Sequence, residues 1–290
     1  MTPHPSYNQL LLTRTALWNG FNKAQNLPEP VQREFEALKR INKKDLGYTF
    51  AAQNGVECVN FHVYDSVADA MAGFLPRSFV IKPLRGHSSY GVYLLKKRPN
   101  GSFYCKMHNK IYKSRAAVVQ DYQRCLLRSK KFTMSEAVIL EEYVRDAFGF
   151  DVPLDYKVYG FQGGSPVVMQ RYAPMHLPKE KWAFEFYDAK GQPLGLIRER
   201  IKSNPEITLQ APKNFDALIK ASDCLMQASR VSFMRVDLYA APKRIIFGEF
   251  TPVPNAGKET YVPEFDRLLG QYWADSLETL GIDYSAYLPL

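Results

Sequence analysis

Two acidic residues on neighbouring strand-like segments have the chemistry of a magnesium site. Asp237 stands in RVDLY, which begins at Arg235, and Glu249 stands in IIFGEFT. Side chains alternate along a strand, so Arg235 and Asp237 share one face. On the second segment the residues that share a face are Phe247, Glu249 and Thr251. If the strands pair through Ala241-Pro242, both carboxylates point the same way, and Mg²⁺ prefers such oxygen ligands.

A surface hairpin with an Arg–Asp salt bridge is the competing interpretation. Acid-bearing hairpins are common, and spacing alone favours the salt bridge. The magnesium interpretation therefore depends on what the neighbouring segments carry.

A glycine-rich loop could bind phosphate. Lys82 closes the apolar segment FVIKP, and RGHSSYG follows from Arg85 to Gly91. Glycines let a backbone approach phosphate closely, and successive amides form an anion-binding concavity. The loop matches neither GxxxxGK[ST] nor GxGxxG, which disfavours both a P-loop and a Rossmann site. On local grounds a polar hairpin tip is an equally good interpretation.

The elements that must position these residues mix strands and helices without strict alternation, so the sequence predicts an α+β fold. The opening seventy or so residues are typical of helices, with segments expected at 31–40, 45–55 and 66–72. Further helices are predicted at 114–128, 213–229 and 263–280, the last opened by a proline. The predicted strands are 58–63, 79–83, 92–95, 137–144, 156–161, 166–171, 231–239 and 244–250.

The composition of the 290 residues narrows the class of protein. No apolar run could cross a bilayer, and the first residues lack the basic region of a signal peptide, so we expect a cytoplasmic protein. Four scattered cysteines without a CxxC pair disfavour zinc. The net charge of +9 favours anionic partners. The densest basic zone, 98–131, fits a binding surface and a solvated helix face equally well.

The order of these pieces resembles the ATP-grasp superfamily. FVIKP with LRGHSSYGV resembles its phosphate-binding lysine and glycine-rich loop, VILEEYV its adenine-binding hinge strand, and DYKVYGF the strand that follows. FMRVDLY and IIFGEFTPVPNAG resemble the metal-binding strands, and NKKDLGYTFAAQNGV a segment with an earlier nucleotide lysine. RVDLY, FGEFTPVPNAG and VPEFDRLLG are most similar to the TupA-like branch, which is associated with teichuronopeptide biosynthesis. The resemblance runs from about Asn42 to the C-terminus.

The resemblance implies a role for each matching residue. Lys44 and Lys82 would contact the α- and β-phosphates, and Glu142 with the next two backbone units would hold adenine. The residues implied in nucleotide binding are Lys44, Lys82, Gly86, Ser88, Ser89, Gly91, Glu142, Tyr143, Val144 and, for the ribose, Asp151. Lys157 and Arg171 would face the γ-phosphate or the substrate carboxylate, and Arg235 would steady the charge in transfer. The implied metal ligands are Asp237, Glu249 and Thr251.

The sequence also departs from the superfamily pattern. Thr251 stands where an Asn is usual; a hydroxyl is a weaker ligand, although the TupA-like branch commonly has Thr here. The family's PGAG is PNAG at 254–257, where Asn tolerates a left-handed backbone. The resemblance implies an ATP-grasp domain at 75–290, with a lid subdomain at 75–144 and a metal-binding subdomain at 145–290. The helical segment 1–74 is short for a full substrate domain.

The implied chemistry is ligation of a carboxylate to an amine with ATP and Mg²⁺. A carboxylate would attack the γ-phosphate to give an acyl phosphate, and an amine would displace phosphate. The expected partners are an acidic substrate, such as a uronic-acid-containing polysaccharide, and an amine or amino acid, with no nucleic acid. A phosphotransferase on the same fold stays open. The complete set of Lys44, Lys82, Arg235, Asp237 and Glu249 argues against a non-catalytic nucleotide-binding module.

Overall fold

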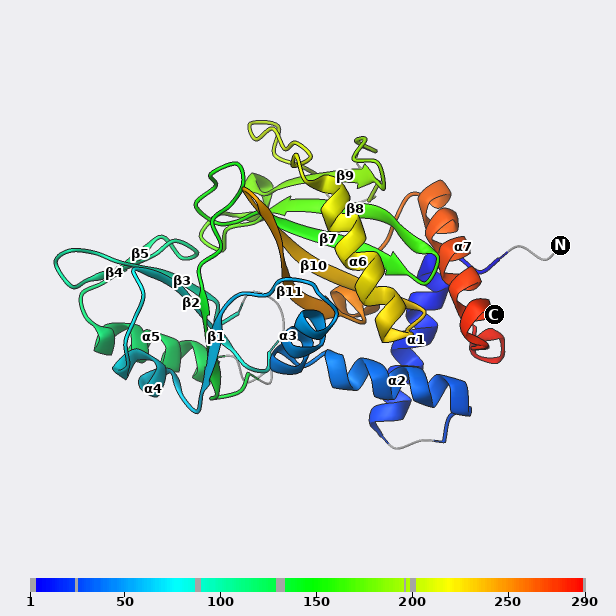
Figure 1. Cartoon of the computed structure of the whole chain (residues 1–290), viewed down its shortest axis with the longest axis horizontal. Helices are drawn as coiled ribbons and strands as arrows, with labels where there is room; N and C mark the ends of the chain where they lie inside the picture. Colours follow the sequence, from blue (N-terminus) through cyan, green and yellow to red (C-terminus); the bar gives the residue numbers. More distant parts are fainter. Residues whose placement is uncertain are drawn as a thin grey trace.

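The structure is a computed structural model, and it describes residues 4–23, 26–86, 90–128, 134–195, 197–198 and 202–288. Two antiparallel sheets, each with helices packed on it, make up the molecule (Figure 1). This mixture confirms the predicted α+β class. Among the described residues, no helix is long and apolar enough to span a membrane.

A six-stranded sheet covered on one face by α4 (Val67–Ala72) and α5 (Arg115–Arg128) forms the smaller half, at the left of Figure 1. Phe79 and Ile81 are buried in the same apolar cluster as both helices. Because side chains alternate, Lys82 points to the opposite face. The strands, in spatial order, are β1 (Phe61–Tyr64), β6 (Val138–Glu142), β2 (Ser78–Pro83), β3 (Tyr93–Lys97), β4 (Phe103–Cys105) and β5 (Lys110–Tyr112).

A five-stranded sheet forms the larger half, with α6 (Phe215–Ser229) across one face. A Cβ added at Gly160 would lie 2.5 Å from Met226 of α6, so this side of the strand faces the helix. Lys157, three residues earlier, points to the opposite face. The strands, in spatial order, are β11 (Arg244–Thr251), β10 (Phe233–Ala241), β7 (Asp155–Phe161), β8 (Gly164–Tyr172) and β9 (Ala183–Asp188).

The N-terminal helices α1 (Tyr7–Asn22) and α2 (Glu29–Ile41) and the C-terminal α7 (Pro263–Leu280) pack at the far end of the large sheet. Arg14 of α1 and Glu34 of α2 form a fully buried ion pair of 2.5 Å. Arg14 also donates to the carbonyl of Phe233, where β10 begins. These contacts anchor both helices to the strand that carries Arg235 and Asp237.

The helix α3 (Lys44–Gln53) lies at the junction of the two sheets. The ring of Tyr48 contacts Phe61 of β1, with ring centroids 4.8 Å apart, and Phe247 of β11 at 5.8 Å. Aromatic contacts of this length contribute to packing beyond the buried area alone. α3 therefore joins the sheet that carries Lys82 to the sheet that carries Asp237.

The predicted elements are largely confirmed. α7 has the predicted bounds, and Ser66 caps α4 by accepting from the amide of Asp69. The predicted strand start at Cys58 is wrong: β1 begins at Phe61, because Cys58 pairs with Phe247 of the large sheet instead. The short strands β4 and β5 and the edge strand β9 lay outside the prediction. The PNAG turn holds Asn255 and Ala256 at φ of 48° and 52°, the left-handed backbone expected for its asparagine.

Candidate active site

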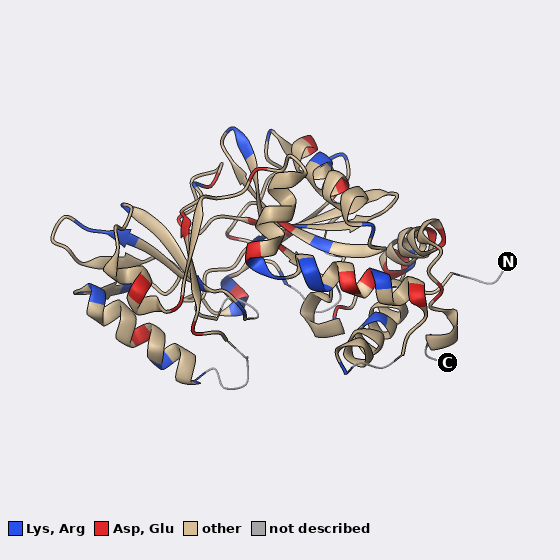
Figure 2. Ribbon diagram, turned by 60° about the horizontal axis from the view of Figure 1, so that its bottom comes forward, with Lys and Arg blue, Asp and Glu red and all other residues tan. Residues whose placement is uncertain are grey.

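Three strands of the large sheet place three charged side chains in one row. Asp237 of β10 lies directly opposite Glu249 of β11 on one side and Lys157 of β7 on the other. Residues directly opposite in a sheet point to the same face. This face is the one away from α6. Figure 2 shows acidic and basic positions next to one another on these strands.

A β-bulge at Gly248 sets the register of the two acids. Asp237 pairs with Glu249 but Leu238 pairs with Phe247, so Gly248 is left without a partner on β10. A Cβ there would lie 2.9 Å from the carbonyl oxygen of Asp237, closer than side chains tolerate. The expectation that Phe247 shares a face with Glu249 is therefore wrong, because the bulge interrupts the two-residue period.

The carboxylate of Asp237 is held by two cations. Arg235 donates from Nε to Oδ1 at 2.7 Å and from Nη2 to Oδ2 at 2.9 Å. Lys157 Nζ donates to Oδ2 at 2.5 Å. Burial raises the pKa of Asp237, but the charges of Arg235 and Lys157 outweigh it and hold the pKa below its usual value. Asp237 is therefore a buried carboxylate that stays ionised at neutral pH.

The carboxylate of Glu249, in contrast, forms no hydrogen bond or ion pair with any residue in the described part of the chain. Its charge acts on Lys44 of α3: burial lowers the pKa of Lys44, and Glu249 partly opposes that shift. The Thr251 hydroxyl accepts from Arg235 Nη2 at 3.1 Å. The Thr251 hydroxyl thus already accepts one bond from Arg235, whereas the carboxylate of Glu249 is fully available to a ligand among the described residues.

These donors fit a hard cation that shares its shell with phosphate. Within the described residues no three His, Cys, Asp or Glu side chains are grouped to hold a metal ion. Asp237 and Glu249 are a pair of oxygen donors on facing positions of one sheet. Mg²⁺ is usually bound by one or two carboxylates together with substrate phosphates and waters. The pair therefore fits Mg²⁺ brought with a nucleotide better than a metal caged by protein alone.

Asp155 is a further acid of this face that the sequence analysis missed. It forms a salt bridge with Arg171, which lies directly opposite on β8, and its Oδ2 is 3.6 Å from Lys157 Nζ. Lys157 and Arg171, the two cations expected near the γ-phosphate, therefore both form ion pairs with Asp155. The available signal was its position two residues before Lys157, which places both side chains on the same face.

The pH dependence of stability tests the Asp155 cluster. Burial raises the pKa of Asp155, but Lys157 and Arg171 outweigh it and lower the pKa from 3.8 to about 2. Because the folded pKa is depressed, the stabilisation is present above the unfolded pKa and is lost as the pH falls through the folded one. We expect this carboxylate to account for about 2 kcal/mol of lost unfolding free energy between those two pH values. Denaturant titrations at several pH values give the unfolding free energy of the wild type and of Asp155→Asn. Between those two pH values, this free energy should fall more steeply with decreasing pH in the wild type, and an equal pH dependence would contradict the assignment.

On the small sheet, Lys82 lies in a buried network at the junction with α3. Its Nζ is 2.7 Å from Glu141 Oε1 of β6 and donates to the Tyr48 hydroxyl at 2.7 Å. Tyr48 in turn donates to Glu141 at 2.5 Å. Charge repulsion from Lys82 also contributes to the lowered pKa of Lys44, after burial, so the two lysines lie near each other. Glu141 and Tyr48 were not singled out by sequence.

The glycine-rich loop begins and ends against Pro83. A Cβ added at Gly86 would lie 3.1 Å from Pro83 Cγ, and one at Gly91 would lie 3.2 Å from Pro83 Cδ. Gly91 also has a φ of +74°, which favours glycine. Ser88 and Ser89, both predicted to cover the triphosphate, lie outside the described residues.

The hinge residues point in different directions. Glu142 is bonded to Arg244 of β11 at 3.0 Å and to Asn60 at 3.2 Å, so its side chain joins the two sheets. Tyr143 and Asp151, predicted for adenine and ribose, meet at Lys106, which donates to the Tyr143 hydroxyl at 3.0 Å and pairs with Asp151 at 3.0 Å. Val144 is buried, with 6% of its surface exposed. Sequence reasoning placed Lys106, which follows β4, only in the basic zone 98–131 and not at the hinge.

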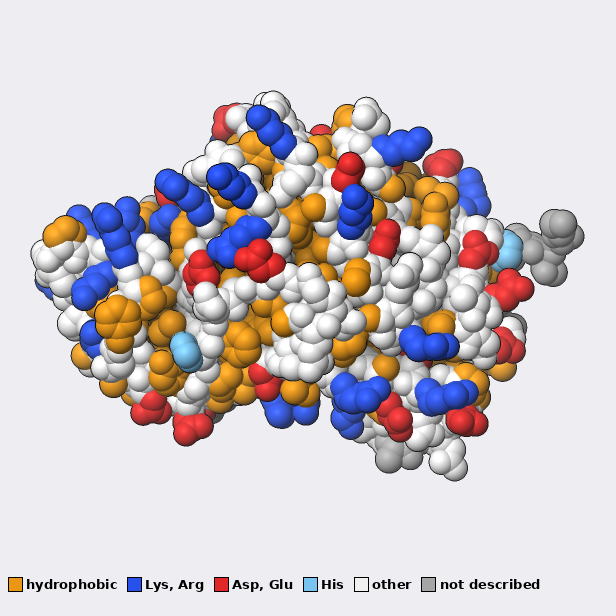
Figure 3. All heavy atoms as spheres, viewed as in Figure 1, with side chains coloured by type: hydrophobic (Ala, Val, Ile, Leu, Met, Phe, Trp, Pro, Cys, Tyr) orange, Lys and Arg blue, Asp and Glu red, His pale blue; other side chains and the backbone are white. Residues whose placement is uncertain are grey.

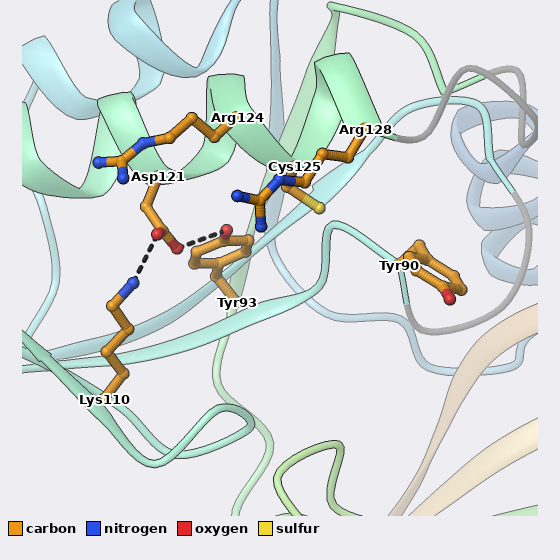
Figure 4. Close-up of a pocket in the computed structure, with 7 residues that line it drawn as sticks. All are labelled: Tyr90, Tyr93, Lys110, Asp121, Arg124, Cys125 and Arg128. Carbon is orange, nitrogen blue, oxygen red and sulfur yellow. Dashed lines mark hydrogen bonds and ion pairs between the residues drawn. The ribbon is translucent and has the colours of Figure 1, made fainter.

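A cavity of about 380 Å³ lies away from these residues, against α5 (Figure 4). Tyr93 in its wall is paired with Ile81, so the cavity is on the face of the small sheet opposite to Lys82. Its carboxylate, Asp121, is bonded to Lys110 at 2.5 Å and to Tyr93 at 3.0 Å. Of the described residues that line this cavity, Tyr90 belongs to the glycine-rich loop, and the others were not predicted to bind the nucleotide.

The basic zone 98–131 does not form one uniform surface. Figure 3 shows Lys and Arg side chains gathered at the free end of the small sheet. Several cations of the zone have partners within the fold: Lys106 bonds Tyr143, Lys110 pairs with Asp121, and Arg115 donates to three backbone carbonyls at the C-terminal end of α4. These residues therefore serve the packing of the small sheet as well as its charge.

The sequence of this chain matches a protein-family model. A model of TupA-like ATP-grasp domains matches residues 24–274, which is most of the chain. The chain belongs to the TupA-like ATP-grasp family. This confirms the resemblance drawn from the sequence. A search of curated proteins found no significant match to this TupA-like chain.

Among solved structures, this TupA-like chain is similar to several ligases at low sequence identity and with TM-scores below 0.5. The D-alanine–D-alanine ligase of Helicobacter pylori is 16% identical, with 88% of this chain and 61% of that chain covered and a TM-score of 0.46. The ligase of the same name from Bacillus anthracis, solved with ATP, is 15% identical over 86% and 62%, with a TM-score of 0.41. An L-amino acid ligase from Bacillus licheniformis is 12% identical over 82% and 46%, with a TM-score of 0.47. The TupA-like chain thus spans about three fifths or less of their lengths.

The predicted residues of the TupA-like chain fall into three groups in the fold. Those of the large sheet share one face: Lys157, Arg171, Arg235, Asp237, Glu249 and Thr251. Lys44 and Lys82 gather at the junction with α3. Glu142, Tyr143, Val144 and Asp151 follow along the hinge, with side chains turned to different neighbours.

Proposed function

We propose that the chain is a Mg-ATP-dependent carboxylate–amine ligase that forms an amide through an acyl phosphate. The observation that carries the proposal is the row of Lys157, Asp237 and Glu249 across three strands, with Arg235 bonded to the same acid. Membership of the TupA-like ATP-grasp family supports it. The proposed metal-binding acids and their cations lie on one face of the large sheet, and the proposed nucleotide lysines lie at the junction with α3.

The chain's residues would divide the work by position. Lys44 and Lys82 would hold the α- and β-phosphates, and the backbone after Glu142 would hold adenine. Lys157 and Arg171 would orient the γ-phosphate or the carboxylate that attacks it. Asp237, Glu249 and Thr251 would hold Mg²⁺, which neutralises phosphate charge when bound. Such a site acts by positioning and by charge stabilisation, and no side-chain nucleophile is needed.

The substrate class follows from chemistry and from the family. An acyl phosphate requires a carboxylate, and its aminolysis requires an amine or amino acid. The resemblance to the TupA-like branch points to a uronic-acid-containing polysaccharide or a similar acidic substrate. The net charge of +9 would favour such an anionic chain.

ADP release with paired substrates tests the function. The chain is incubated with Mg-ATP and a uronic acid or acidic amino acid, each with and without an amine. A ligase should complete turnover only with both partners and should release phosphate. ADP formation with one hydroxyl-bearing partner, and no phosphate released, would identify a phosphotransferase and contradict the proposal.

Lys82→Ala is expected to weaken ADP binding by about tenfold to a hundredfold, because it removes a charged hydrogen-bond donor to phosphate. Calorimetric titration measures the affinity. Lys96→Ala is the matched control, because Lys96 is exposed on the neighbouring strand β3. This variant should bind ADP with the affinity of the wild type. Unchanged affinity in Lys82→Ala would remove this lysine from the phosphate site.

A further inference from the structure

Arg198 lies beside the candidate active site, although no motif singled it out. It belongs to the segment between β9 and α6. That segment is fixed to the chain after β11, because the amide of Val262 donates to the carbonyl of Ile197 at 2.9 Å. Arg198 Nη1 lies 3.7 Å from Glu259 Oε1, and its guanidinium is 5.8 Å from the Tyr261 ring centroid.

Glu259 connects Arg198 to the row of charges on the large sheet. Glu259 is 1% exposed, and three hydroxyls donate to it, those of Tyr7, Tyr159 and Tyr261. Tyr159 is directly opposite Arg235 in the sheet. The charge of Glu259 opposes the lowering effect of burial on the pKa of both Arg198 and Arg235. The two arginines therefore flank the same carboxylate.

Arg198 is nearly buried, and its guanidinium has donors without a partner among the described residues. Its side chain is 13% exposed, and its long ion pair with Glu259 is its one polar contact among the described residues. Arg14 and Arg235, the comparable buried arginines, each donate three hydrogen bonds. A guanidinium has five donors in a fork that matches a carboxylate. Glu259 is already supplied by three hydroxyls, so the fork of Arg198 is left for a ligand.

We propose that Arg198 binds the carboxylate of the acidic substrate and holds it beside Arg235 for phosphorylation. The inference rests on the proposed ligase function and locates the carboxylate within that site. The ligand class is an organic acid, with the carboxylate as the recognised group. Neutral substrates of the same shape would leave the buried guanidinium unpaired, which disfavours them.

The step that Arg198 would position is balanced. One oxygen of the held carboxylate forms a bond to the γ-phosphorus. The bond from that phosphorus to the bridging oxygen breaks, and its electron pair leaves with ADP. No proton moves in this step. Arg198 orients the acid, while Arg235 and Lys157 stabilise the negative charge of the phosphate.

The test titrates a carboxylate against ADP release by wild type, Arg198→Gln and Arg198→Lys. D-glucuronate and L-glutamate are the probes, with glycine as a fixed amine, and ADP affinity is measured separately. We expect Arg198→Gln to raise the half-saturating probe concentration about tenfold to a hundredfold without changing ADP affinity. Arg198→Lys keeps the charge but loses the fork, so its half-saturating probe concentration should lie between those of the wild type and Arg198→Gln. Arg267→Gln is the control, because that arginine is 67% exposed on α7.

The outcomes separate this inference from the function on which it rests. Unchanged half-saturation in Arg198→Gln, with or without a lower melting temperature, would overturn the inference alone and leave Arg198 a structural partner of Glu259. If neither probe stimulates ADP release by the wild-type chain, the proposed function fails in its stated substrate class, and the inference fails with it.

Discussion

Replacing Glu249 by Gln is expected to abolish Mg-ATP turnover while leaving the melting temperature unchanged. The Glu249 carboxylate has no hydrogen-bond or ion-pair partner among the described residues, so the substitution removes an oxygen ligand and breaks no such contact there. Asp237→Asn should also abolish turnover, but it should lower the melting temperature. The reason is that Arg235 and Lys157 lose the acid they share. For each variant we expect a loss of about 10³-fold or more in kcat, measured as ADP release at saturating Mg²⁺.

A control and a binding measurement complete this test. Glu278→Gln changes an exposed acid on α7 and should behave like wild type. Mg²⁺ together with ADP should raise the melting temperature of the wild type more than ADP alone. Both site variants should lose that difference. Turnover near wild type in either variant would place the metal site elsewhere.

Arg235→Lys is expected to lower kcat by about 10²–10³-fold with ADP affinity nearly unchanged. Arg235 contacts both oxygens of Asp237 and the Thr251 hydroxyl, so its guanidinium is fixed before any substrate arrives. A lysine could not reach these acceptors at once. Charge is redistributed over the transferred phosphoryl group and its neighbours during transfer. A preorganised cation should therefore help the transition state more than bound ADP.

The competing role for Arg235 is purely structural, as the partner of Asp237. In that case Arg235→Lys would retain most activity, and Arg235→Ala would mainly lower the melting temperature. Measuring kcat, ADP affinity and melting temperature on both variants distinguishes the two roles. Retained kcat in Arg235→Lys would remove Arg235 from catalysis.

Local patterns in the sequence were enough to locate the main elements of the site. FVIKP was predicted as a strand, and it forms β2, which buries Phe79 and Ile81 and turns Lys82 to the other face. The RVDLY alternation correctly placed Arg235 and Asp237 on one face, where they are bonded. These predictions succeeded because period-two burial and short turns are encoded within a few residues.

Contacts between distant segments could not be predicted in the same way. Glu141 lies next to the hinge residue Glu142, yet it is Glu141 that pairs with Lys82, because β6 lies beside β2 in the sheet. Tyr48 joins this pair from a helix more than thirty residues away, and Arg198 reaches Glu259 from a segment without a regular element. Such pairings depend on strand order and helix placement, which a single sequence does not state.

The bulge at Gly248 makes the site sensitive to the length of its hairpin. Ala241 pairs with Arg244, so near the turn each odd-numbered residue lies opposite an even-numbered residue. Asp237 and Glu249 are both odd, and a regular ladder would place Glu249 opposite Val236 on the other face. One unpaired residue brings the two acids together. Without the bulge, the same residues would form a regular hairpin with the two acids on opposite faces, whereas deletion of Gly248 itself would move Glu249 into the position opposite Asp237 of a regular ladder.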